Sequence, residues 1–187
     1  MKHTLLSGFF ALSLAMGINA GQHIPDTHKV AGFAVGLQAY TFNRFTVFEA
    51  IEKTDQAGGK VIEFYPDQPL SPDERTVRWN HNSPDDVIEK VKAKLAQHKV
   101  LAVNYGVVGG KDEAEWRKIF EFAKKLNLYG ITTEDIQHLD IIEKLVKEFD
   151  VKVGIHEHGK RADDPSHLSA FYRWQSPAWM QLTVSLR

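Results

Sequence analysis

The sequence predicts an α/β protein of repeated β/α units, and three observations support this fold class. Five short apolar segments alternate with four longer segments whose apolar residues recur at helical spacing. Glycine, proline and serine mark several of the boundaries between them. Each connection between two apolar segments is long enough to hold a helix, whereas an antiparallel hairpin needs only a short turn. The strands are therefore expected to run parallel, joined by right-handed crossovers.

The expected elements lie between residues 35 and 156. Strands are predicted at 35–40, 60–65, 100–105, 129–133 and 151–156, and helices at 46–57, 83–98, 112–126 and 135–149. Two architectures accommodate such units, an open doubly wound sheet and a (β/α)₈ barrel. No glycine-rich phosphate-binding motif follows the first strand, which counts against the nucleotide-binding version of the open sheet.

The helix at 83–98 has the clearest start signal. Ser83 is predicted as its N-cap, and Pro84 stands at its first turn. Asp85 and Asp86 follow, and their negative charges favour the positive end of the helix dipole. The sequence therefore predicts that this helix begins at Ser83.

Composition restricts the chemistry that the chain can perform. Its 187 residues include 23 Lys and Arg against 24 Asp and Glu, a formal net charge of -1, which favours neither a nucleic acid nor an anionic membrane as partner. The absence of cysteine excludes disulfides, thiolate metal sites, iron–sulfur clusters and cysteine nucleophiles. Any metal ion must therefore be bound by His, Asp and Glu.

The first 20 residues have the pattern of a Sec-type signal peptide. A basic start at 1–3 precedes an apolar run at 4–17, and Ala20 is a small residue suited to cleavage. The run is shorter than the roughly 20 residues that cross a bilayer. We therefore expect an exported protein, periplasmic or secreted, with a polar leader at 21–32 and no membrane segment after cleavage.

Polar residues gather where the predicted strands end. In β/α-repeat folds the carboxyl ends of parallel strands converge on one face, and this face carries the active site in barrel enzymes. The residues at these ends are Gln38, Tyr40, Glu63, Tyr65, Asn104, Tyr105, Glu134 and the run His156-Glu157-His158. We expect them to line one cup.

The most informative short motif is His156-Glu157-His158. In strand geometry His156 and His158 project to the same face, while Val153 and Ile155 face the opposite way. Imidazole and carboxylate groups together suit Mn, Fe, Co or Zn. The same pattern equally fits two partly exposed histidines at a strand end.

Two acidic residues allow alternative roles. Glu134 serves either as a ligand or general base, or as a charge that stabilises the N-terminus of the helix after it. Glu63 stands in the apolar stretch Val61-Ile62-Glu63-Phe64, where an ionised carboxylate is costly to bury without a partner. This cost favours a site role for Glu63.

Five segments, in this order along the chain, resemble one protein family. They are GLQAYTF (36–42), GGKVIEFYP (58–66), VNYGVV (103–108), YGITTE (129–134) and VKVGIHEHG (151–159). They resemble the sugar phosphate isomerase/epimerase group with the xylose-isomerase-like TIM barrel, whose superfamily includes endonuclease-IV-type enzymes. The resemblance spans about residues 35–165 and is most similar to exported bacterial members. It implies the (β/α)₈ barrel as the architecture.

The resemblance also implies a reaction. In this family a divalent cation, here Mn, Mg, Co or Zn, orients the oxygens of a sugar or polyol while acids move a proton between adjacent carbons. On that basis the candidate metal ligand is His156, the candidate catalytic residues are Glu134 and His158, and the candidate substrate-binding residues are Gln38, Tyr40, Glu63 and Asn104.

The chain departs from the family pattern after residue 165. The Asp-Thr-Gly-His-like segment and the later ligand-bearing strands of the family have no match, and 187 residues fall short of the about 250 of a full barrel. Residues 166–187 are rich in aromatic side chains but carry no β/α pattern. We therefore expect an incomplete barrel of about five β/α units with an irregular tail, caused by a truncated or frameshifted gene.

Two alternatives to an isomerase or epimerase follow from this departure. The first is a non-catalytic exported binding protein that self-associates through open sheet edges. The second is an inactive truncated fragment. Metal binding at His156 would favour the enzyme, whereas sugar binding that survives a chelator would favour the binding protein.

Overall fold

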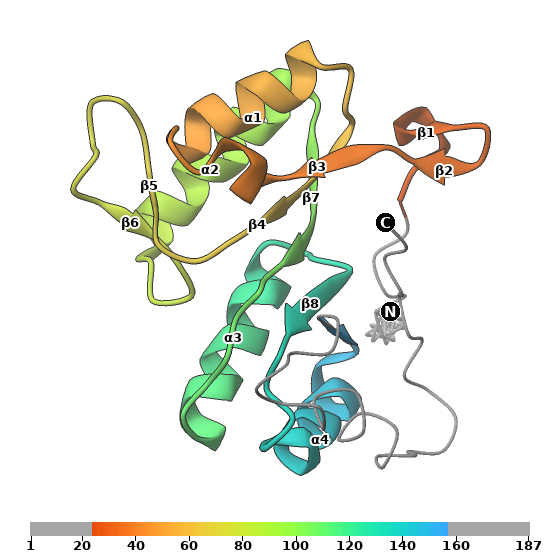
Figure 1. The fold of residues 1–187 in the computed structure, drawn as a ribbon, viewed down its shortest axis with the longest axis vertical. Helices are drawn as coiled ribbons and strands as arrows, with labels where there is room; N and C mark the ends of the chain where they lie inside the picture. The colour runs from red at the N-terminus through yellow and green to blue at the C-terminus, as the bar shows by residue number, and fades with distance from the viewer. Residues whose placement is uncertain (1–23, 157–187) are drawn as a thin grey trace, which may run out of the picture.

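The computed structural model describes residues 24–156, and Figure 1 shows their arrangement. The predicted signal peptide at 1–20, the candidate catalytic residue His158 and the tail at 166–187 lie outside the described residues. The main sheet has five strands, all parallel, and its order is β3-β4-β7-β8-β9. These strands are β3 (Gly36–Gln38), β4 (Val61–Phe64), β7 (Leu101–Tyr105), β8 (Gly130–Thr133) and β9 (Lys152–Ile155).

The strand order distinguishes the two predicted architectures. Each strand of the main sheet lies beside the strand of that sheet that precedes it in the chain. A doubly wound sheet reverses its direction of growth once, whereas a barrel adds every new strand on the same side. Five strands in sequential order are therefore the sheet of a TIM-barrel-type fold, and the predicted incomplete (β/α)₈ class is confirmed for the described units.

Four helices connect the strands: α1 (Val47–Gln56), α2 (Asp85–His98), α3 (Glu113–Lys125) and α4 (Leu139–Phe149). α1 packs against α2 and α3 against α4, and Figure 1 shows these as two pairs. The core contains strand residues such as Phe64 and Ile131 together with helix residues such as Trp116 and Phe120, all fully buried. One face of β4, β7, β8 and β9 thus contributes buried residues to this core, whereas β3 contributes none.

Two helix starts differ from the prediction. Ser83 does not cap α2, because its Oγ accepts a hydrogen bond from the Asn80 amide at 3.0 Å and donates to the Arg78 carbonyl at 3.3 Å. The helix begins at Asp85, with Pro84 as an N-cap that makes no side-chain bond. The serine therefore closes the preceding turn instead of the helix end.

The predicted helix at 135–149 begins four residues late, at Leu139. Asp135 Oδ1 accepts hydrogen bonds from the backbone amides of Gln137 at 3.0 Å and His138 at 3.2 Å. An aspartate that bonds the next amides favours a turn over a helix. The segment 135–138 is thus a turn, and Ile136 within it is exposed instead of lying on the apolar side of a helix.

Short elements appear where the sequence predicted none. In the expected leader, β1 (Lys29–Val30) pairs antiparallel with β2 (Phe33–Ala34), after a 3₁₀ turn, η1 (Asp26–His28). After β4, the loop holds a second small hairpin, β5 (Gln68–Pro69) with β6 (Arg78–Trp79). The first predicted strand ends early, at Gln38, and continues as the 3₁₀ turn η2 (Ala39–Phe42).

β3 and β9 are the outermost strands of the described sheet. Self-association through these edges stays a prediction. Within residues 24–156, none of the helices has both the length and the apolar character needed to cross a membrane.

Candidate functional site

The face of the sheet that does not pack against the helices carries polar side chains. In β4, Ile62 and Phe64 are fully buried in the core, whereas Glu63 between them is only partly buried. In β8, Thr132 stands in the same way between the fully buried Ile131 and Thr133. Successive side chains of a strand point to opposite faces. We call this second face the inner face; it carries Glu63, Asn104, Thr132, Gly154 and His156.

Strand register brings three predicted site residues level with one another. Gln38 of β3 pairs with Glu63 of β4, and Glu63 pairs with Asn104 of β7. An irregularity between Ile62 and Glu63 shifts the register by one residue on β7, from Ala102 to Asn104. Bulges of this kind re-aim side chains. Here the bulge places Asn104 opposite Glu63 while Tyr105 stays in the core.

A hydrogen-bond network joins three strands on the inner face. Asn104 Nδ2 donates to Glu63 Oε1 at 2.8 Å, and Thr132 Oγ1 donates to the same oxygen at 2.9 Å. Asn104 Nδ2 also donates to Thr132 Oγ1. The carboxylate of Glu63 therefore has the partners that its burial requires.

The environment of Glu63 raises the pKa of its carboxyl. Burial raises the pKa of its carboxyl above the usual value, while the bonds from Asn104 and Thr132 and the charge of His156 act in the opposite direction. The net shift is upward because burial has the largest effect. A carboxyl with a raised pKa next to other titratable groups is typical of proton-transfer sites.

Two glycines of the inner face differ in their surroundings. A Cβ on Gly130 would lie 2.7 Å from Asn104 Oδ1, closer than such atoms approach, so the glycine makes room for the amide. Among residues 24–156, a Cβ on Gly154, in the next strand, would meet nothing within 4 Å. Gly130 thus shapes the network, whereas Gly154 leaves open space.

His156 and Glu134 form a second polar pair at the ends of β9 and β8. The His156 amide extends the ladder by donating to the Thr133 carbonyl at 2.8 Å, and its Nε2 lies 3.9 Å from Glu134 Oε1. Both side chains are partly exposed, at 40% and 44%. Because α4 begins at Leu139 and its first-turn acid is Asp140, Glu134 does not act at that helix N-terminus, and this alternative is wrong.

The described residues do not complete a metal site. Within residues 24–156, no three His, Asp or Glu side chains come close enough together to hold a metal ion. His156 and Glu134 supply two groups of suitable chemistry, whereas protein metal sites take three or more ligands. The predicted partner His158 lies outside the described part.

Tyr40 lies apart from the network, on the turn that follows β3. Its ring is 57% exposed and packs edge-to-face against Tyr65, which follows β4, with 5.2 Å between centroids. Burial raises the pKa of the Tyr65 hydroxyl, so the group stays protonated. The two rings form an aromatic surface beside the ends of β3 and β4.

Asp135 fixes the loop that carries Glu134. Its Oδ2 accepts a bond from Trp116 Nε1 at 3.2 Å and lies 2.7 Å from His138 Nδ1. Burial on its own would raise the pKa of Asp135, but the bonds from His138, Trp116 and the Gln137 amide together hold it below the usual value. The loop after β8 is thereby tied to α3 and to the start of α4.

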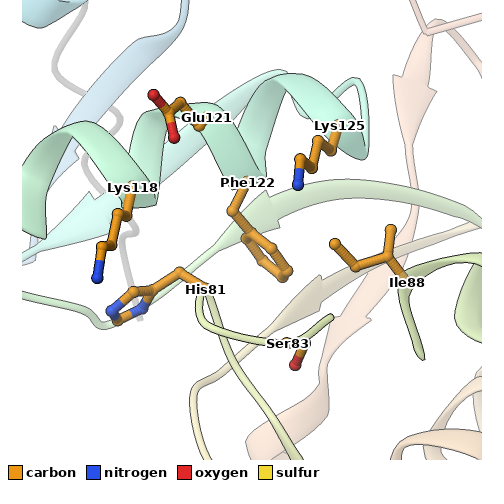
Figure 2. Close-up of a pocket in the computed structure, with 7 residues that line it drawn as sticks. All are labelled: His81, Ser83, Ile88, Lys118, Glu121, Phe122 and Lys125. Carbon is orange, nitrogen blue, oxygen red and sulfur yellow. The ribbon is translucent and has the colours of Figure 1, made fainter. Parts of the chain in front are cut away.

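A small cavity of about 50 Å³ lies away from the inner face, between α3 and the segment that leads into α2. Figure 2 shows Lys118 and Phe122 of α3 on one side and His81, Ser83 and Ile88 on the other. Sites for small organic ligands usually enclose about 300–1,000 Å³. The cavity is therefore too small for a sugar, and the candidate site remains the inner face.

Thr132 is the member of the network that sequence reasoning missed. The stretch Gly130-Ile131-Thr132-Thr133 was recognised as a strand, and its alternation puts Thr132 on the face opposite Ile131. That alternation was the available signal. The contact with Glu63, 69 positions away, depends on the order of the strands and could not be predicted from spacing.

Comparison with known proteins finds similarity only among solved structures. No protein-family profile matches the chain, and no curated protein does. Among solved structures, the chain is similar to an uncharacterized protein from Parabacteroides distasonis, with 29% identity and a TM-score of 0.61, over 66% of this chain and 53% of that one. A D-psicose 3-epimerase crystallised in the presence of D-fructose matches with 10% identity and a TM-score of 0.47, over 67% of this chain and 53% of that one. The chain thus spans about half the length of these structures, and the site itself must indicate the chemistry.

Proposed function

We propose that the inner face binds a sugar or polyol and belongs to an isomerase or epimerase that moves a proton between adjacent carbons. The observation that carries the proposal is the convergence of Glu63, Asn104 and Thr132, with His156 and Glu134 beside them, at the carboxyl ends of four consecutive parallel strands. This is the face on which TIM-barrel enzymes place their active sites.

The side chains suit a sugar as ligand. Carboxylate, amide and hydroxyl groups supply the acceptors and donors that sugar hydroxyls need. The aromatic surface of Tyr40 and Tyr65 offers an apolar face for the C–H groups of a sugar ring, and Gln38 stands level with Glu63. The substrate-binding roles of Gln38, Tyr40, Glu63 and Asn104 stay predictions.

The reaction needs a base and a group that stabilises negative charge on oxygen. In our proposal the Glu134 carboxylate takes the proton from the carbon next to the carbonyl. The C–H electron pair forms the C=C bond of an enediolate, and the carbonyl π electrons move to its oxygen. The ring N–H of His156 donates a hydrogen bond to that oxygen. Glu134 then returns the proton to the former carbonyl carbon, while the hydroxyl on the first carbon passes its proton to the enediolate oxygen and its carbon becomes the new carbonyl. Epimerisation instead needs an acid on the opposite face of the first carbon.

A divalent cation is the usual Lewis acid for this chemistry. Its binding by His156, with Glu134 as a second ligand, stays a prediction because the described residues do not provide a third ligand. No step above depends on it.

The test is hydrogen exchange at carbon. The full chain is incubated in D₂O with a panel of unphosphorylated aldoses and ketoses, once with Mn²⁺ and once with EDTA, and deuterium incorporation is followed by NMR. We expect deuterium next to the carbonyl of at least one sugar. The Glu134→Gln variant should lose about 100-fold in exchange rate, the range for removal of a general base.

The matched control is Glu89→Gln, because Glu89 lies on the exposed surface of α2 and pairs with Lys92. This variant should exchange at the wild-type rate. Sugar binding without exchange under either condition would contradict the enzyme and favour a binding protein. Absence of both binding and exchange would overturn the proposed function altogether.

A further inference from the structure

We propose that Asn104 and Thr132 are positioning residues that hold one oxygen of Glu63, so that its second oxygen, Oε2, accepts a hydrogen bond from one particular hydroxyl of the sugar. The inference rests on the proposed function and deepens it. It assigns to Glu63 the selection of a hydroxyl group and gives Thr132 a role that the sequence did not predict.

The two oxygens of the Glu63 carboxylate differ in their hydrogen bonds. Among the hydrogen bonds within residues 24–156, those that reach Glu63 both end on Oε1, one from Asn104 Nδ2 at 2.8 Å and one from Thr132 Oγ1 at 2.9 Å. The donors come from β7 and β8, so they hold the carboxylate from the same side of β4. A carboxylate held by one oxygen keeps acceptor capacity on the other.

The absence of a side chain at Gly130 leaves space for the Asn104 amide. Gly130 pairs with Asn104 in the β7–β8 register, and a Cβ there would lie 2.7 Å from Asn104 Oδ1. The backbone of Gly130 is not among the positive-φ positions, so its conformation does not require glycine. The missing side chain therefore serves the placement of the Asn104 amide.

The position of Glu63 is unfavourable for the stability of the fold. A partly buried carboxylate with a raised pKa costs folding free energy that an apolar residue would not. Asn104 of β7 and Thr132 of β8 supply the hydrogen bonds that hold this carboxylate on the inner face. Groups that a fold retains against stability are commonly functional.

The experiment compares Thr132→Val with Thr132→Ser by calorimetric titration of the sugar that the full chain binds best and of its monodeoxy analogues. Valine keeps the shape of threonine without the donor, and serine restores the donor. We expect Thr132→Val to weaken binding of the parent sugar about tenfold, the effect of one hydrogen bond to a charged group. One deoxy analogue lacks the hydroxyl whose hydrogen bond Glu63 accepts, and it should bind Thr132→Val as tightly as it binds the wild-type chain. Thr132→Ser should restore most of the affinity for the parent sugar.

A second pair of variants tests the placement of Asn104. Gly130→Ala should weaken binding of the parent sugar as Thr132→Val does, whereas Glu89→Gln, on the exposed surface of α2, should not. An equal loss for the parent sugar and every deoxy analogue in Thr132→Val would overturn the inference, because it would indicate a structural role alone.

The inference stays testable if the wild-type chain binds none of the sugars, a result that would count against the proposed function. ¹³C NMR titration of the Glu63 carboxyl measures its pKa without a ligand. The titratable groups that face it are His156 and, beside His156, Glu134. Thr132→Val should raise the pKa of Glu63 because a bond that favours the ionised form is lost, and an unchanged pKa would show that Thr132 does not hold the carboxylate.

Discussion

Replacing Glu63 with glutamine should reduce the rate of carbon–hydrogen exchange by about 10–100-fold and make the protein more stable at neutral pH. The first effect follows because a neutral amide oxygen accepts a hydrogen bond from a sugar hydroxyl more weakly than a carboxylate does, so the sugar binds less tightly. The second follows because burial makes the ionised carboxylate unfavourable, as its raised pKa indicates. A residue that only supported the fold would show the opposite effect on stability.

The contribution of Glu63 to folding stability depends on pH. The folded-state pKa of Glu63 is raised above the ordinary value of 4.5 that applies to the unfolded chain. The folded form therefore binds the proton more tightly, and the stability that Glu63 contributes falls as pH rises from about the unfolded pKa through the folded pKa. Above that window the ionised group is a fixed cost, and Glu63→Gln removes it.

Thermal unfolding at pH 4 and pH 7.5 measures this effect. We expect the glutamine variant to melt at a higher temperature than the wild type at pH 7.5 and close to the wild type at pH 4. A lower melting temperature at pH 7.5 would show that the carboxylate stabilises the fold and would count against a functional role.

Replacing Trp79 with alanine should cost about 3–5 kcal/mol, the largest loss of stability that we expect for the described part of the chain. Trp79 lies in β6, and its ring packs between Phe64 of β4, at 5.6 Å, and Phe122 of α3, at 5.0 Å. It is fully buried. The residue thus joins the hairpin after β4 to the core, and chemical denaturation measures what its removal costs.

Trp79→Phe is the matched control. Within the described structure the indole Nε1 of Trp79 is buried and makes no hydrogen bond, so phenylalanine removes an unsatisfied donor while it keeps most of the apolar contact. We expect it to cost less than half as much as alanine. A loss under about 1 kcal/mol for Trp79→Ala would contradict the assigned packing.

Periodicity was sufficient to predict the five main strands and the four helices, because β4, β7, β8 and β9 have a buried face and each helix has an apolar stripe. β3 has no buried residue, and only 36–38 of its predicted range 35–40 form the strand. The strand at 60–65 and the helix at 112–126 match β4 and α3 within about two residues. The same alternation identified Glu63 as an unusual acid. These features are local, so a single sequence records them.

Features that depend on contacts distant in sequence were not predictable. The bulge that aligns Asn104 with Glu63, and the reach of Thr132 to the same oxygen, follow from the register of three strands. The late start of α4 depends on Asp135, whose side chain bonds Trp116 as well as the next amides. The Ser83 cap failed for a local reason instead, because the serine bonds Asn80 and Arg78 in the turn just before it.

The central claim is that a neutral sugar binds to the inner face, and NMR amide shift mapping of the isotopically labelled full chain tests it most directly. Addition of the sugar that exchanges or binds best should shift the resonances of Glu63, Asn104, Thr132 and His156, and the Glu63→Gln variant should lose these shifts. Shifts confined to the cavity around His81 and Lys118, or spread over the helices with no change at Glu63, would contradict the claim.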